Sequence, residues 1–134
     1  MKKKINRILS ISAFCFVLLL PSLAMASSYV STFSILTSSG FKGATRSYDG
    51  SNLGITTYGK TADGQSAYGT SSIFYIALYR DNTWADDHIG TVTHSRTADS
   101  TSKWSSVGKG NYYFTFWKND DKVYVKGTVG MFNY

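Results

Sequence analysis

Short runs in which apolar and polar residues alternate, each closed by a cluster of Gly, Asn, Asp or Ser, dominate this sequence from residue 27 onward. Successive side chains of a β-strand point to opposite faces, so this alternation predicts strands with one buried face. We find no stretch that keeps the 3.6-residue period of an amphipathic helix. The chain is therefore constrained to fold mainly as β-sheet.

The runs are short, and turn signals separate them at intervals of about ten residues. They cover residues 29–36, 44–48, 53–60, 73–80, 88–95, 103–107, 111–118 and 122–133. The connections leave no room for the crossover helices that parallel strands need. We therefore expect an all-β domain: a single antiparallel β-sandwich of seven or eight strands, jelly-roll or Ig-like.

The first 26 residues have the order of parts found in a secretory signal peptide. A basic start, Met1 to Arg7, precedes an apolar run over 8–20, and Ala24 and Ala26 supply the small residues of a cleavage site. The apolar run is shorter than the roughly 20 residues that span a membrane comfortably. We expect a secreted, extracellular protein cut after Ala26, with no permanent membrane anchor and one domain over 27–134.

Removal of this segment changes the charge and cysteine content of the chain. Residues 27–134 keep ten Lys and Arg against eight Asp, a net charge of +2 instead of the +6 of the whole chain. We therefore predict no nucleic-acid partner. The single Cys and the single Pro both lie before residue 27, so the expected domain cannot form an internal disulfide.

One part of the chain resembles a known type of module. An apolar strand ends in Ala77-Leu78-Tyr79-Arg80, a polar loop leads to residues 89–92, and Trp104 is followed by Val107-Gly108 and 110–114. This order is similar to the later half of small β-sandwich modules beside secreted bacterial hydrolases, of the pre-peptidase C-terminal type. The resemblance covers about a third of the chain and implies a non-catalytic sandwich module.

A second, fainter resemblance involves Thr93-His94-Ser95 and the Tyr-Tyr-x-x-x-Trp segment that ends at Trp117. These residues are similar to parts of the lactococcin-like bacteriocins. That resemblance implies an antimicrobial role at the cell envelope.

Residues that support catalysis or tight metal binding are few. Residues 27–134 contain no Cys and no Glu, and no Gly-x-Ser-x-Gly motif occurs, so we predict that the protein is not an enzyme. Asp81, Asp86 and Asp87 crowd one inter-strand segment, and such carboxylates suit Ca²⁺. The same residues are common turn formers, so calcium is the weaker of the two interpretations.

Aromatic side chains are the remaining candidates for a function. In three of the runs, residues that should face the core alternate with a second set: Tyr75, Tyr79, Tyr113, Trp117 and Tyr124. If these strands are neighbours, the second set forms a surface that is partly exposed. Tyr and Trp combine a flat apolar face with a polar group and bind at low entropic cost.

We therefore predict a secreted binding module for cell-wall or extracellular polysaccharide, with these five aromatic residues as its contacts. The alternative is a secreted antimicrobial, bacteriocin-like protein that acts on the cell envelope. A third interpretation is that these aromatic side chains serve only the ordinary packing of the sheet.

Overall fold

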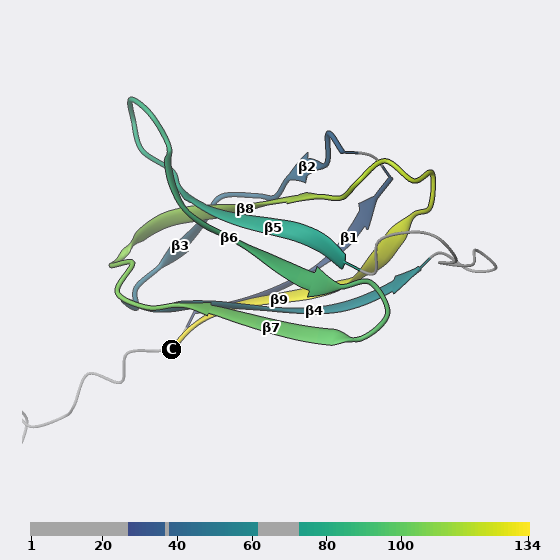
Figure 1. The fold of residues 1–134 in the computed structure, drawn as a ribbon. Helices are drawn as coiled ribbons and strands as arrows, with labels where there is room; N and C mark the ends of the chain where they lie inside the picture. Colours follow the sequence, from purple (N-terminus) through teal and green to yellow (C-terminus); the bar gives the residue numbers. More distant parts are fainter. Residues whose placement is uncertain (1–26, 37, 62–72) are drawn as a thin grey trace, which may run out of the picture.

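A computed structural model of the chain describes residues 27–36, 38–61 and 73–134. Residues 1–26, the predicted signal peptide, lie outside the described residues. The described part is all-β, with nine strands in two antiparallel sheets that form two layers (Figure 1). The first sheet has the order β1 (Ser28–Ile35), β9 (Val125–Asn133), β4 (Leu53–Thr61), β7 (Asp99–Trp104). The second contains β2 (Phe41–Lys42), β8 (Gly110–Trp117), β5 (Ile73–Arg80) and β6 (Asp87–Ser95), with β3 (Arg46–Tyr48) also paired to β8.

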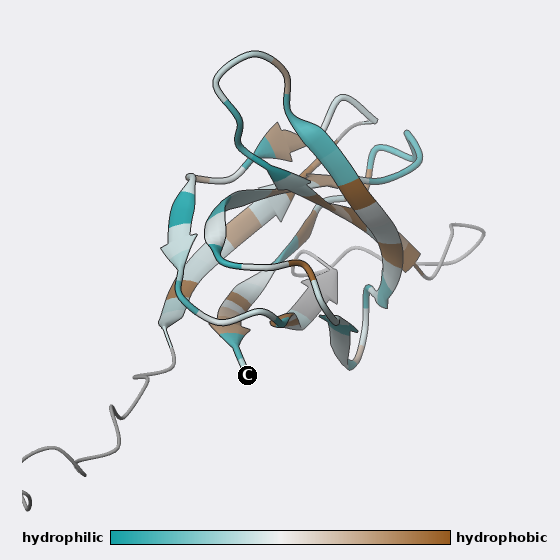
Figure 2. Ribbon diagram, turned by 90° about the vertical axis from the view of Figure 1, so that its left-hand side faces the viewer, coloured by the Kyte–Doolittle hydropathy of each residue, from teal (hydrophilic) through white to brown (hydrophobic). Residues whose placement is uncertain are grey.

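The hydrophobic core lies between the two layers. β1, β4 and β9 contribute aliphatic and aromatic side chains from the four-stranded sheet, and β5 and β8 face them from the five-stranded sheet. Phe33 on β1 contacts both Phe74 and Phe116 on the opposite sheet, with ring centroids 5.4 and 5.8 Å apart. Hydrophobic and hydrophilic residues alternate along the strands, as Figure 2 shows. The predicted inward set of β5 and β8 is therefore confirmed: Phe74, Ile76, Leu78, Tyr112, Phe114 and Phe116 are all buried.

The strand count differs from the prediction of seven or eight, because the segment after β1 is broken. β2 and β3 pair with the same edge of β8, through Phe41↔Phe116 and Arg46↔Tyr112. Between them, the Gly43 N–H still donates to the Phe114 carbonyl at 2.8 Å. One edge strand has thus become two short pieces, and the sequence run at 44–48 revealed only the second.

The predicted strand at 103–107 is also displaced: β7 covers Asp99–Trp104. The N–H groups of Val107 and Gly108 donate to the Ser51 carbonyl instead, at 2.8 and 3.1 Å. This partner lies more than fifty residues earlier in the chain, so local alternation could not indicate it.

A buried histidine joins the two sheets. His94, on β6, lies between Thr57 of β4 and Ser102 of β7, with its ring nitrogens 2.7 and 2.9 Å from their hydroxyl oxygens. His94 is 1% exposed. Burial disfavours the charged imidazole and lowers the pKa of His94 to about 4. The neutral ring is therefore part of the contact between the layers.

Two buried cations share one carboxylate near the end of the five-stranded sheet. Arg96 and Lys118 are fully buried, and both bind the Asp121 side chain. Burial acts to raise the pKa of Asp121, but hydrogen bonds from Lys118, Arg96 and the Val123 N–H lower it to about 2. This cluster fixes the segment between β8 and β9.

Within the described ranges, no helix has the length and apolar character needed to cross a membrane.

Candidate binding surface

The outer face of the five-stranded sheet carries two cross-strand pairs of aromatic rings. The register of β5 and β8 places Tyr75 opposite Trp117 and Tyr79 opposite Tyr113. Tyr75 and Trp117 stack with centroids 5.4 Å apart and planes at 15°. Tyr79 and Tyr113 stack at 5.3 Å and 6°. Such directly opposed pairs stabilise a sheet, and they bring four of the five predicted site residues onto one surface.

Between these two aromatic pairs lies a row of three non-aromatic residues. Ala77 and Thr115 face each other across β5 and β8, and Lys42 of β2 is opposite Thr115 on the other side. Residues two apart on a strand are about 7 Å apart, so this row separates the two aromatic pairs along the strands.

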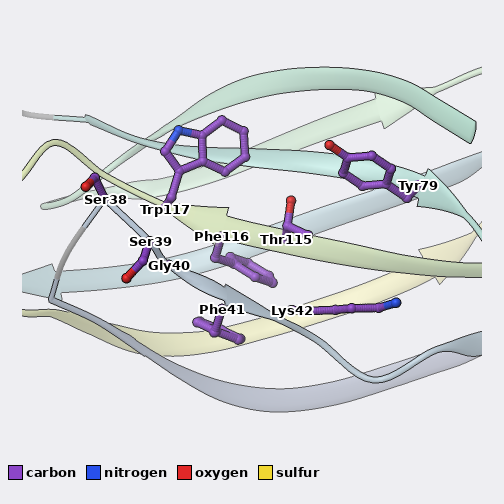
Figure 3. A pocket seen from close by; sticks show the side chains of 9 residues that line it. All are labelled: Ser38, Ser39, Gly40, Phe41, Lys42, Tyr79, Thr115, Phe116 and Trp117. Carbon is purple, nitrogen blue, oxygen red and sulfur yellow. The ribbon is translucent and has the colours of Figure 1, made fainter. Parts of the chain in front are cut away.

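A depression lies beside β2 and reaches Thr115 of this row. The depression has a volume of about 570 Å³ and is lined by Ser38, Ser39, Gly40, Phe41, Lys42, Tyr79, Thr115, Phe116 and Trp117. In Figure 3, Trp117 and Tyr79 stand on one side of the β8 ribbon with Thr115 between them, while Phe116 and Phe41 point the other way. The aromatic walls of the depression thus belong to the outer face, and the phenylalanines anchor its strands in the core.

Glycine at position 40 lets the β1–β2 turn approach Trp117. Gly40 has φ +56°, in the left-handed region that side chains disfavour. A Cβ atom there would lie 1.8 Å from the Phe116 carbonyl oxygen and 2.8 Å from the Trp117 Cβ. The turn can therefore form the wall of the depression only with glycine at this position.

The far end of the aromatic surface is covered. Tyr113, expected to be at least partly exposed, is only 6% exposed, because the β5–β6 loop over residues 81–86 and the Lys42 side chain lie against it. The Tyr113 hydroxyl donates to Asp86 at 2.7 Å, and the Lys42 ammonium lies 3.6 Å from the ring centroid. Desolvation, helped by the Asp86 carboxylate, raises the pKa of Tyr113 to about 12. Tyr113 therefore supports the surface and is not an open contact.

Tyr75, Tyr79 and Trp117 are half-buried, so each keeps part of its ring accessible. Tyr124 is 39% exposed and lies immediately before β9, at the end of the connection that leads from β8 to the other sheet. Its ring lies 5.5 Å from the Lys126 ammonium. The shared surface is expected only if the three strands are neighbours, and that condition is not met for Tyr124, since β9 pairs with β1 and β4 and not with β5 or β8.

The three Asp residues proposed for calcium are engaged with neighbouring groups. Asp81 accepts from Thr45 at 2.8 Å, and Asp87 accepts from the Asn82 amide at 2.7 Å. Asp86 accepts from Tyr113 and from the Asn82 N–H, and both bonds lower the pKa of its carboxyl. In the part of the chain that the structure describes, no three His, Cys, Asp or Glu side chains form a group that could hold a metal ion. The carboxylates fix the β5–β6 loop over Tyr113.

The sequence did not indicate the polar residues that line one side of the depression. Lys42, Thr115 and the turn at Ser38–Gly40 line it, yet only the cross-strand register brings them to Trp117 and Tyr79. It also missed Trp84, whose side chain is 98% exposed in the loop that projects between β5 and β6 (Figure 1). The polar residues of that loop predicted a turn, but they did not indicate that the loop projects from the sheet.

Comparisons with known proteins identify no family. No model of a known protein family matches the sequence, and no curated protein matches it. A solved structure described as Bacillus endospore appendages, a family of disulfide-linked pili, is similar with a TM-score of 0.44 and 6% sequence identity. The match covers 81% of this chain and 86% of that chain.

Proposed function

We propose that this protein is an exported, non-catalytic module that binds a polysaccharide of the cell wall or of the extracellular medium. The observation that carries the proposal is the depression on the five-stranded sheet, where Trp117 and Tyr79 flank Thr115. Aromatic faces accommodate the apolar C–H faces of sugar rings. The hydroxyl groups and the ammonium group in the same depression are suited to the sugar's own hydroxyls.

The two-layer fold provides the rigid support that such a site needs. If β2 and β3 are counted as one broken strand, eight strands form two sheets of four. Every connection between consecutive strands then crosses from one sheet to the other, apart from the β5–β6 hairpin. This topology favours the jelly-roll type of sandwich over the Ig type. Trp117 and Tyr79 lie on its inner strands, so little rearrangement is needed on binding.

Export is the second part of the proposal. Residues 1–26 have the organisation of a signal peptide, and we propose cleavage after Ala26. N-terminal sequencing of protein collected from the medium should begin with Ser27-Ser28-Tyr29. An intact chain in the membrane fraction would contradict this part of the proposal.

The binding function is tested by retention on insoluble cell-wall and plant polysaccharides. Trp117→Ala should abolish retention. The matched control is Tyr58→Ala, which removes a 48% exposed aromatic side chain from the opposite outer face and should retain binding. Equal retention of both variants would refute the site. Growth inhibition of other bacteria without glycan retention would favour the antimicrobial alternative.

A further inference from the structure

The edges of the two sheets differ in how they are protected. The edge formed by β2 and β3 is broken into pieces of two and three residues. β6 and β7 contact each other where the chain turns from one sheet into the other, and the Ser95 N–H donates to the Ser100 hydroxyl there. Short pieces and covered margins are common ways to prevent unwanted strand pairing.

β1 is less protected. The Tyr29 hydroxyl donates to the Ser47 carbonyl at 3.0 Å, and the Arg46 guanidinium lies 4.9 Å from the centroid of the Tyr29 ring, so only this end of the strand is covered. It is continuous over Ser28–Ile35, and among the described strands it pairs with β9 alone, at the margin of its sheet (Figure 1). Its sequence, Ser-Tyr-Val-Ser-Thr-Phe-Ser-Ile, contains no charged residue, no Pro and no Gly. Val30 is 79% exposed on it. A long, uncharged edge strand is a template for another strand.

We propose that β1 pairs antiparallel with β1 of a second copy of this chain, about a two-fold axis at Ser31. The inward side chains of both copies must lie on the same side of the joined sheet, which restricts the register. With Ser31 on the axis, Tyr29 faces Phe33 of the second copy on the inner side, and Val30 faces Thr32 on the outer side. Aromatic and β-branched pairs of this kind stabilise antiparallel strands.

The uncharged sequence favours a second copy as the partner. Across a two-fold axis, a charged residue near the axis lies opposite or diagonally next to the same residue of the second copy, and like charges so close destabilise the pair. β1 avoids this cost over all eight residues, although charged residues occur on β4, β6, β7 and β9. The product is one eight-stranded sheet in which the two copies of β1 are central. This pairing is independent of the polysaccharide site, which lies on the other sheet.

Sedimentation equilibrium of the exported protein over a range of concentrations tests the proposal. The protein should form a reversible dimer. Val30→Lys should raise the dissociation constant about tenfold, because two unfavourable contacts form per dimer. The control Thr101→Lys places the same charge on exposed β7 of the same sheet and should leave the dissociation constant unchanged.

A charge-pair variant tests the register. Val30→Lys combined with Thr32→Glu places each Lys opposite the Glu of the second copy and should restore the dimer. Thermal unfolding of each variant confirms that it is folded. A monomer up to millimolar concentration, a dimer that Val30→Lys does not weaken, or a double variant no more dimeric than Val30→Lys would each overturn the proposal.

Discussion

The two outer faces of this molecule share a backbone architecture but differ in their side chains. On the five-stranded sheet, β5 and β8 carry stacked Tyr and Trp rings. On the four-stranded sheet, the outward positions of β4, β7 and β9 include Thr56, Thr101 and Thr128, which we call the threonine face, together with Gly, Lys and Asp residues and two separate aromatic residues, Tyr58 and Phe132. Thr56 and Thr101 share a hydrogen bond of 2.8 Å.

The difference between the faces shows where a function can lie. Threonine hydroxyls and charged side chains can be exposed to water at little cost, and Phe132 on this face packs against Tyr134 with ring centroids 6.2 Å apart. Aromatic rings in an exposed group promote association, and the β5–β6 loop covers Tyr113 at one end. The cover ends before Trp117, and the depression begins there. The uncovered part of the aromatic face is therefore the candidate for recognition.

The largest expected effect tests which face of β8 points into the core and which belongs to the outer surface. Phe116→Ala should lower the free energy of unfolding by roughly 3–5 kcal/mol, because it empties space between the sheets. Thr115→Ala changes the preceding residue, whose side chain lies on the outer face, and should lower the free energy of unfolding by only roughly 0.5 kcal/mol. Urea unfolding measures both values. Similar costs for the two variants would mean that the faces of β8 are reversed.

The second expected effect concerns the contact that holds the two sheets together at His94. The pKa of His94 is about 4 in the folded protein, below its ordinary value of 6.5, so the unfolded state binds more protons. Stability should therefore fall by about 3 kcal/mol as the pH drops from 6.5 to 4. His94→Gln should remove this dependence, whereas the control His88→Gln, at an exposed site, should retain it. A flat profile in the unmodified protein would contradict the buried neutral imidazole.

A smaller effect tests the cover over the aromatic face. Tyr113→Phe keeps the ring but removes the hydrogen bond to Asp86, and should cost about 1 kcal/mol. Amide exchange in residues 81–87 should become faster, since the loop loses a contact. Unchanged exchange would show that other contacts hold the loop.

The smallest effect concerns the threonine face. Thr101→Val removes the exposed hydrogen bond to Thr56 and should change the unfolding free energy by no more than about 0.5 kcal/mol. A loss of several kcal/mol in thermal unfolding would mean that this face, too, has a packing role.

The alternation of apolar and polar residues predicted where the strands lie better than it predicted which strands pair with each other. The strand over 73–80 and its inward set are confirmed, because the pattern is local and strong. The broken edge at β2 and β3 and the position of β7 depend on hydrogen bonds between distant residues, which a local pattern cannot show.

The same limit applies to the candidate site. The sequence indicated that Tyr75, Tyr79, Tyr113 and Trp117 point away from the core. It did not reveal that the register stacks them in pairs, that a loop buries Tyr113, or that the strand after Tyr124 belongs to the other sheet. These facts depend on the order of the strands, and each run of residues is compatible with many orders.

The most direct test of the central claim is a chemical-shift map of the protein titrated with a soluble fragment of the polysaccharide that retains it. Binding in the depression should shift signals of the Trp117 indole and of Lys42, Thr115 and Tyr79, with no shifts at Thr56, Thr101 or Thr128. Shifts that concentrate on the threonine face, or on the loop that carries Trp84, would contradict it.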